Sequence, residues 1–432
     1  MALKFRTPRG TRDILPDEIW KWHFVENRLR DIFRTYSFEE IRTPVFEETE
    51  LFARGIGQTT DIVQKEMYTF TDKGGKSFTL RPEMTASVMR AFLQHHLGEQ
   101  RTVQKLYYIA PMFRQERPQA GRLRQFHQYG VEIIGTPEPL ADAEVIAVAM
   151  EILTSLGVTG LTLKLNSVGC PKCRPRYKRV LQETLRPVLP QLCPDCQKRY
   201  ETNPLRILDC KRETCRALTA EVPSIEEYLC DDCRTHFTQV KEYLQEAGIE
   251  FEADKRLVRG LDYYTRTAFE IVTDQLGAQD AVCGGGRYDL LAAELGEREV
   301  PGVGFAAGME RLLAVMDKLN LFPEKPAGLE LYLIGLGEEA RRWCFRQAQT
   351  LRRRGIVCEL DYLGRSLKAQ MREANKLKAR YVVIVGENEL RRGSVVLKEM
   401  ATGEQQDTPM ASLENELVRR LAREPGEGAA KS

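Results

Sequence analysis

Four segments of this chain place charged and polar side chains inside otherwise apolar, strand-like stretches. They span residues 79–85, 110–135, 257–271 and 283–313. Arginines bind phosphate oxygens through paired hydrogen bonds, and carboxylates hold Mg²⁺ or an ammonium group. Together these residue types favour a site for a polyphosphate and a zwitterion. The candidate site residues are Glu83, Thr85, Arg114, Glu116, Gln128, Glu132, Arg259, Tyr263, Tyr264, Tyr288 and Arg311.

The glycines of the fourth segment do not match a known phosphate-binding loop. The run Gly284–Gly286 lacks both the GxxxxGK[ST] spacing and the strand-to-helix context of a GxGxxG turn. Taken alone, such a run is more typical of a bulge or a tight turn than of a phosphate cradle.

Length and composition place the chain among ordinary globular proteins. It has 432 residues with a formal net charge of +2, 42% hydrophobic and 29% charged residues. These values exclude wholesale disorder and a strongly basic nucleic-acid coat. The longest aliphatic runs have the length of strands, and the N-terminus has no apolar signal core. We therefore expect a cytoplasmic protein without a membrane partner.

Residue patterns divide the chain into two domains and an insertion. Strand patterns at 76–82, 104–116, 126–135, 161–169 and 268–274 carry many polar residues, which favours an α+β domain over 1–322 built on an antiparallel sheet. Residues 170–240 are rich in Cys, Arg and Pro and are interpreted as an insertion. After a linker at 322–328, strands alternating with helices over 329–420 predict an α/β domain with a largely parallel sheet. Residues 421–432 are predicted to be a disordered tail.

Eight of the eleven cysteines lie in the insertion, at spacings that suit zinc. The first four residues of this set match a C-x2-C…C-x2-C pattern, and the last four form a second plausible group. Four thiolates suit tetrahedral Zn²⁺. Reduced thiols without a metal are the alternative, and spacing does not reveal how the pairs combine. The candidate ligands are Cys170, Cys173, Cys193, Cys196, Cys210, Cys215, Cys230 and Cys233.

Several motifs resemble one family of proteins. IRTPVFEE with Pro44, FRQE with the loop RPQAGRLRQFHQ, and GVGFAAGMERL are similar to the three signature motifs of class II aminoacyl-tRNA synthetases. RPEMTASVMR and RGLDYYTRTAFE narrow the resemblance to the histidyl-tRNA synthetase family, bacterial type. The resemblance implies an antiparallel catalytic domain, a C-terminal anticodon-binding domain and a homodimer formed partly through the Pro44 region. It also implies that L-histidine and ATP form histidyl-adenylate, from which histidine passes to its tRNA.

The same resemblance implies roles for individual residues. Arg114 is expected at the α-phosphate, Arg311 at the γ-phosphate, and Glu116 at ATP or its Mg²⁺, while Arg259 resembles an additional catalytic arginine. Around histidine, Glu83, Thr85 and Gln128 are expected at the ammonium group and Glu132 and Tyr264 at the imidazole, with Tyr263 and Tyr288 in the same pocket. Arg117, Arg122 and Arg124 are expected to meet the acceptor end of the tRNA. Because the histidine carboxylate is already ionised at pH 7, adenylation needs positioning and charge neutralisation and no general base.

Two other functions compete with tRNA charging. A histidine-sensing regulatory subunit of ATP phosphoribosyltransferase would typically lack the anticodon domain and the motif arginines, whereas this chain has both. A plain tRNA-binding module would not explain Glu83, Gln128 and Glu132. Residues 341–380 carry 12 Lys and Arg against three acidic residues, and this local charge suits phosphate contacts although a solvated helix face is the simpler reading.

Overall fold

The computed structural model describes residues 5–58, 60–117, 122–276, 281–325 and 328–421. The chain divides into two compact units, residues 1–322 and 323–432. Of the tail predicted at 421–432, residues 422–432 lie outside the described residues.

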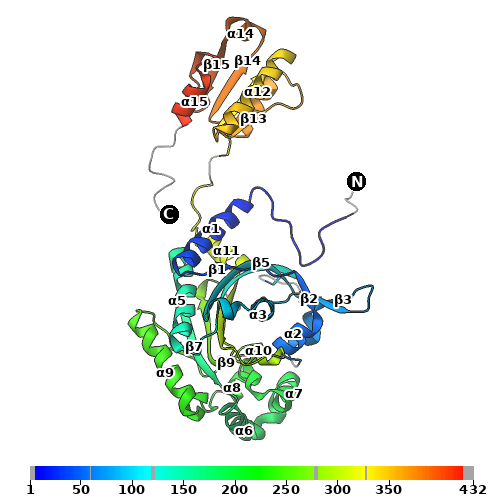
Figure 1. Cartoon of the computed structure of the whole chain (residues 1–432), viewed down its shortest axis with the longest axis vertical. Coiled ribbons are helices and arrows are strands. Elements are labelled where there is room, and N and C mark those ends of the chain that lie inside the picture. Colours follow the sequence, from blue (N-terminus) through cyan, green and yellow to red (C-terminus); the bar gives the residue numbers. More distant parts are fainter. Residues whose placement is uncertain (1–4, 59, 118–121, 277–280, 326–327, 422–432) are drawn as a thin grey trace. The chain divides into compact units, whose positions relative to one another are not determined.

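A mostly antiparallel sheet forms the centre of the first unit (Figure 1). Parallel pairing occurs at the two edges, and the inner strands pair antiparallel, so the sheet type predicted for this half is confirmed. In spatial order the strands are β1 (Glu39–Glu40), β5 (Gln104–Phe113), β6 (Gln125–Ile134), β11 (Gly302–Gly308), β10 (Ala281–Arg287), β9 (Thr265–Thr273), β7 (Leu161–Gly169) and β8 (Glu252–Ala253).

The two faces of this sheet pack against different helices. Apolar side chains of one face, such as Val131 and Ile133, pack with helices α1 (Ile19–Thr35), α5 (Pro139–Ser155), α9 (Asp231–Glu246) and α11 (Met309–Lys318). The alternate positions, such as Tyr108 and Met112, pack with α3 (Thr85–Gln94) and α10 (Leu291–Glu294). The sheet curls around α3, which lies in its hollow (Figure 1). A smaller sheet of β2 (Phe46–Glu48), β4 (Ser77–Leu80) and β3 (Tyr68–Thr71) adjoins α2 (Thr49–Ile56).

The insertion is a helical module with its own core. It contains α6 (Arg174–Leu185), α7 (Pro194–Thr202) and α8 (Glu213–Leu218), and α9 leads back to the sheet. Six of the eight insertion cysteines are buried in this core together with side chains such as Tyr177 and Ile207. The helices are short, so the module depends on its core and on links to the sheet.

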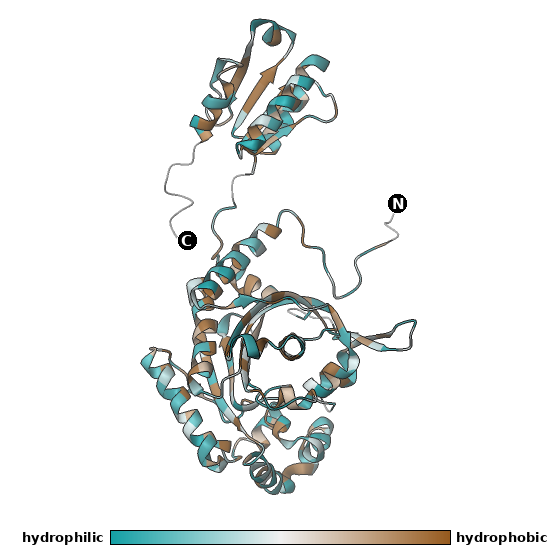
Figure 2. Cartoon of the chain, viewed as in Figure 1, coloured by the Kyte–Doolittle hydropathy of each residue, from teal (hydrophilic) through white to brown (hydrophobic). Residues whose placement is uncertain are grey.

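The second unit is an α/β fold with a mixed sheet. Its strand order is β13 (Cys358–Leu360), β12 (Leu331–Gly335), β14 (Tyr381–Val385), β15 (Ser394–Glu399) and β16 (Gln405–Pro409). Only the first three strands are parallel, so the prediction of a largely parallel sheet is only partly correct. The helices are α12 (Glu338–Arg353), α13 (Leu367–Lys376), α14 (Glu387–Arg392) and α15 (Leu413–Leu421). Hydrophobic residues gather on the strands, and hydrophilic ones cover the outer helix surfaces (Figure 2).

Candidate active site

A cavity of about 620 Å³ lies between the start of α3 and the strands of the large sheet. Residues from all four polar segments line it, so the fold brings together groups that are far apart in the sequence. The predicted site residues that line it are Glu83, Thr85, Arg114, Glu116, Arg122, Gln128, Arg259, Tyr263, Tyr264, Tyr288 and Arg311.

Glu132 lies beneath the wall of this cavity and does not line it directly. Its side chain on β6 is 1% exposed, and it accepts hydrogen bonds from Thr85 Oγ1 at 2.7 Å and from the Tyr288 hydroxyl at 2.5 Å. Burial raises the pKa of Glu132 to about 8, although these hydroxyls oppose the shift. A Cβ atom on Gly304 of the neighbouring strand would lie 1.8 Å from Glu132 Oε2, so only glycine leaves room for the carboxylate there.

Glu83 forms the start of α3 as well as part of the cavity. Its carboxylate accepts the backbone N–H groups of Thr85 at 2.8 Å and Ala86 at 2.9 Å. These N–H groups have no hydrogen-bond partner inside the helix, and the carboxylate provides one. Its negative charge also interacts favourably with the positive N-terminal end of the helix dipole. Burial raises the pKa of Glu83, and the two N–H groups reduce that shift.

Three tyrosines form the aromatic side of the cavity. The rings of Tyr263 and Tyr264 lie 4.8 Å apart, and Tyr288 meets Tyr263 edge-on at 5.8 Å. Such offset and edge-on contacts hold rings in fixed positions. This side of the cavity is therefore a largely aromatic surface with its rings held in place.

Tyr288 is held in place by its neighbour Arg287, which is fully buried. Arg287 forms a two-pronged ion pair with Asp142 of α5 and donates to the carbonyl oxygens of Thr136 and Glu138. His236 of α9 also forms a hydrogen bond with Asp142, at 3.2 Å, and is not a member of either group of four cysteines. Burial by itself would raise the pKa of Asp142, but its charged and hydrogen-bonding partners lower it to about 2.

Two arginines of the cavity are held by backbone carbonyl oxygens. Arg114 donates from Nε to the carbonyl oxygen of Pro82 at 2.9 Å and lies over the ring of Phe126 at 5.3 Å. Arg311 donates from Nη1 to the carbonyl oxygen of Ala281 at 2.7 Å. Burial lowers the pKa of Arg311, and the positive charge of neighbouring arginines adds to this effect. A bound polyanion would relieve that repulsion.

Arg259 enters the cavity beside the glycine-rich strand. It donates to Glu270 Oε1 at 3.1 Å and lies over the ring of Tyr264 at 5.7 Å. A Cβ atom on Gly284 would lie 2.4 Å from Arg259 Nη1. The run Gly284–Gly286 is a stretch of central strand and not a turn, with a register irregularity only between Gly286 and Arg287. Gly284 therefore leaves space for the guanidinium.

The three arginines predicted to meet tRNA occupy different places. Arg122 lines the cavity and lies 3.2 Å from Glu116 Oε2. Arg124 closes the base of the β5–β6 connection, where its carbonyl oxygen accepts the Arg114 N–H at 2.9 Å. Arg117 is exposed and does not line the cavity. The connection between Arg117 and Arg122 falls on residues 118–121, outside the described residues.

Sequence reasoning left three charged residues of the cavity without a role. Arg12, Glu270 and Glu310 line it. Glu310 accepts the backbone N–H of His127 at 3.0 Å, and Glu270 pairs with Arg259. Glu270 could have been found as a charged residue inside the apolar strand pattern AFEIV, whereas Arg12 precedes the first helix and gives no such signal.

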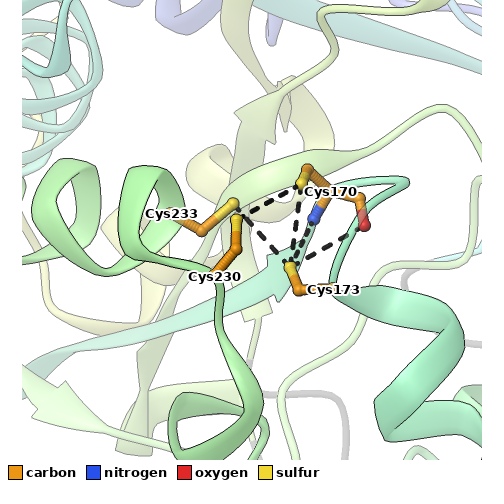
Figure 3. A group of neighbouring side chains, drawn as sticks. All are labelled: Cys170, Cys173, Cys230 and Cys233. Carbon is orange, nitrogen blue, oxygen red and sulfur yellow. Dashed lines mark hydrogen bonds between the residues drawn. The ribbon is translucent and has the colours of Figure 1, made fainter.

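The eight insertion cysteines form two groups of four. Cys170, Cys173, Cys230 and Cys233 form the 170–233 cluster (Figure 3), and Cys193, Cys196, Cys210 and Cys215 form the 193–215 cluster. Within each cluster the sulfur atoms lie within 4.8 Å of one another. Spacing left the pairing open, and the two groups differ from the sets formed by the first four and the last four cysteines. The first and last pairs in the sequence form one cluster, and the two pairs between them form the other.

An antiparallel sheet that carries arginines and carboxylates into one cavity, followed by a separate α/β unit, is the architecture of class II aminoacyl-tRNA synthetases. The family model described as histidyl-tRNA synthetase matches residues 10–172 and 203–312, and an anticodon binding domain model matches residues 330–420.

Individual relatives agree with these matches. The histidine–tRNA ligases of Caldanaerobacter subterraneus subsp. tengcongensis and Halothermothrix orenii are each 53% identical over 95% of this chain and 98% of their own length. The crystal structure of apo S. aureus histidyl-tRNA synthetase is similar with a TM-score of 0.81 at 39% identity, over 96% of this chain and 99% of that one. The chain belongs to the histidyl-tRNA synthetase family. Among its described residues, no helix has the length and apolarity needed to cross a membrane.

Proposed function

We propose that this protein joins L-histidine to histidine tRNA in two steps, with ATP as co-substrate and histidyl-adenylate as the intermediate. The observation that supports this most directly is a pair of buried polar atoms at the cavity. Within the described part of the chain, Gln128 Oε1 and Arg259 Nε are buried without a hydrogen-bond partner. Buried polar atoms normally have partners, so this acceptor and this donor suit the ammonium and phosphate groups of the two substrates.

The histidine end of the cavity combines acceptors with an aromatic wall. We assign Glu83, Thr85 and Gln128 to the ammonium group, and Glu132 with Tyr264 to the imidazole. Neutral imidazole offers one donor and one acceptor, so the carboxyl group of Glu132 and the hydroxyl of Tyr264 can match both. A pocket whose polar atoms must be paired strongly rejects amino acids that lack those groups. This pocket therefore needs no separate hydrolytic editing site.

The phosphate end supplies fixed positive charge. Arg114 and Arg259 are assigned to the α-phosphate, where charge develops as the histidine carboxylate attacks and pyrophosphate leaves. Arg311 is assigned to the γ-phosphate. The site also suits Mg²⁺, because the carboxylate of Glu116 lines the cavity beside these arginines. When bound, Mg²⁺ neutralises charge on the β- and γ-phosphates.

In the second step, the terminal ribose hydroxyl of the tRNA attacks the carbonyl carbon of the adenylate, and AMP leaves. No histidine or lysine among the described residues lines the cavity as a base. We assign the proton to an oxygen of the departing phosphate. Histidyl transfer from stereospecific phosphorothioate adenylates tests this step: one isomer is expected to react more slowly, and equal rates with both isomers and the unmodified adenylate contradict it.

The decisive experiment is ATP–pyrophosphate exchange with each of the twenty amino acids in the absence of tRNA. Exchange with histidine alone is the expected result. A histidine-binding regulatory subunit of ATP phosphoribosyltransferase, the competing function, would bind histidine without exchange. The presence of Arg114, Arg259 and Arg311 in the cavity favours the enzyme.

The proposal includes a cytoplasmic homodimer. On the small three-stranded sheet near Pro44, Phe46 and Phe70 are 48% and 44% exposed and contact each other edge-on. Exposed aromatic clusters are typical of interfaces. Sedimentation of the wild type is expected to show a dimer and that of Phe46→Asp a shift toward monomer, whereas a monomeric wild type contradicts this assignment.

Structural zinc in the insertion belongs to the same proposal. The thiols of each cluster are close enough to share one metal ion, and sulfur ligands without carboxylates suit Zn²⁺. Bound zinc would hold the short helices of the insertion together. Metal analysis of the purified protein tests it directly: negligible zinc contradicts the assignment.

A further inference from the structure

The sulfur geometry of the 170–233 cluster is that of a tetrahedral thiolate site. Four sulfurs at about 2.3 Å from a central Zn²⁺ must lie about 3.8 Å from one another. Cys170 Sγ lies 3.7 Å from both Cys173 Sγ and Cys230 Sγ, and Cys173 Sγ lies 3.9 Å from Cys233 Sγ (Figure 3). These separations are far longer than a disulfide bond. The Cys170 backbone N–H also donates to Cys173 Sγ at 3.2 Å.

This cluster lies where both ends of the insertion meet the catalytic sheet. Cys170 directly follows β7, Cys173 directly precedes α6, and Cys230 directly precedes α9. A metal ion there would fasten the first turn of α6 against the end of β7. It would therefore fix the residue that follows Cys173, which is Arg174.

Arg174 links the cluster to the proposed histidine pocket. Its guanidinium donates to the carbonyl oxygens of Val168 at 2.9 Å, Gly169 at 3.0 Å and Tyr264. The Tyr264 side chain lines the catalytic cavity. Cys173 of the cluster is thus joined by a peptide bond to Arg174, whose side chain forms a hydrogen bond with the backbone of Tyr264, a residue assigned to histidine recognition. The positive charge of Arg174 also lies next to the cluster, where it would offset the negative charge of four thiolates around Zn²⁺.

We propose that zinc bound by Cys170, Cys173, Cys230 and Cys233 positions Tyr264 through Arg174, so that this metal site sets the affinity for histidine. The proposal rests on the assignment of Tyr264 to histidine binding above. Arg174 is a positioning residue in this scheme. The 193–215 cluster is a second, separate zinc site, in which Cys193 Sγ lies 4.0 Å from Cys210 Sγ.

The test compares metal content with the kinetics of histidine-dependent exchange in the full-length protein. The wild type is expected to carry two zinc ions per chain, and Cys230→Ser one. Arg174→Gln is expected to keep both ions and to raise the KM for histidine about tenfold, with kcat changed less than threefold, because a hydrogen bond from a charged donor is lost. Lys172→Gln is the matched control: this exposed cation pairs with Asp232 at 3.2 Å and has no bond to Tyr264. It should keep both zinc ions and the wild-type KM.

A double variant separates coupling from general damage. If zinc acts through Arg174, the KM of Cys230→Ser/Arg174→Gln should equal that of either single variant, whereas independent effects multiply. Should Cys230→Ser fail to fold, cobalt-substituted wild type provides the second readout. Thiolate–cobalt absorption is expected to change on adding histidine, and to change much less in Arg174→Gln.

The outcomes distinguish the two levels of the proposal. Fewer than two zinc ions in an active wild type, an unchanged KM in Arg174→Gln, an equal KM rise in Lys172→Gln, or multiplying effects in the double variant each overturn the inference. A wild type with two zinc ions that activates no histidine overturns the proposed function itself, and with it the role given to Arg174.

Discussion

Replacing Arg114 by glutamine tests the phosphate end of the cavity. The guanidinium is held before any substrate arrives, by the bond from Nε to the Pro82 carbonyl oxygen and by the ring of Phe126. Its side chain is 21% exposed, so part of it still faces the cavity. A group fixed in this way stabilises developing charge without having to reorganise during the reaction.

The expected loss follows from that arrangement. Removing one preorganised donor from a developing oxyanion costs about 3–4 kcal/mol, or a factor of about 10² to 10³ in kcat. Arg114→Gln removes both the donor and its charge, and we expect a loss at the upper end of this range. Arg114→Lys keeps the charge but loses the bond to Pro82 and the planar donor pair, so we expect it to fall between the wild type and glutamine.

The assay is ATP–pyrophosphate exchange at saturating histidine and ATP, with folding checked by circular dichroism. Arg101→Gln serves as the control, because Arg101 is exposed and precedes the opposite end of β5. Its kcat should stay within twofold of the wild type. A kcat for Arg114→Gln within threefold of the wild type, in folded protein, would refute the assignment of Arg114 to the reacting phosphate.

Three further predictions follow from the same structure. Glu132→Gln should raise the KM for histidine about 10- to 100-fold and leave the KM for ATP unchanged. Equal changes in both constants contradict its role. Arg117→Gln should lower tRNA charging several-fold while exchange without tRNA stays at the wild-type rate, because Arg117 is exposed outside the cavity; a parallel loss in both assays contradicts this. The pKa of Asp142 is lowered from 3.8 to about 2, so its ionised form stabilises the fold above pH 3.8. The free energy of unfolding should therefore fall by about 2 kcal/mol as the pH drops from 3.8 through 2. Acid unfolding should show this loss in the wild type and not in Asp142→Asn, whose stability is already reduced.

The sequence indicated which residues line the cavity better than it indicated how their side chains are held. Charged residues inside apolar strand patterns are costly to bury without a function, so Arg114 and Arg259 could be recognised. The burial depth of each side chain was not predictable, because the alternation of polar and apolar residues along a strand does not show whether a side chain lines a cavity or lies beneath its wall. Glu132 is therefore found under the surface, bonded to Tyr288. Glu83 is found at the start of a helix, a role that spacing did not suggest.

The pairing of the cysteines lay beyond the sequence for a different reason. A C-x2-C spacing fixes each pair locally, but the path of the chain between pairs decides which pairs meet. Here Cys170 and Cys230 both lie where the insertion joins the sheet, so the outermost pairs combine. The same cysteine spacings would arise if the first four and the last four cysteines each formed a site. Spacing alone therefore does not distinguish that arrangement from the one in which the outermost pairs combine.

The mixed sheet of the second unit has a local cause. Only the six-residue helix α14 separates β14 from β15, too short a connection to return the chain for parallel pairing. Strand β16, with the sequence QQDTP, is mostly exposed at the edge and has no apolar alternation, so no strand was predicted there. Predictions held where helices of ten or more residues separate the strands, as with α12 and α13.

The glycines explain how an antiparallel sheet can carry an ionic site at all. Neighbouring strands leave little space above the backbone, and a β-carbon on Gly284 or Gly304 would fill the space taken by Arg259 or Glu132. Glycine weakens a strand, and here it occurs at positions where a charged side chain lies over the backbone. Gly284 leaves room for Arg259, which we propose binds phosphate, and Gly304 leaves room for Glu132, which we propose acts at the histidine end. Of the run that suggested a turn, Gly284 is the member that leaves room for a charged side chain, that of Arg259.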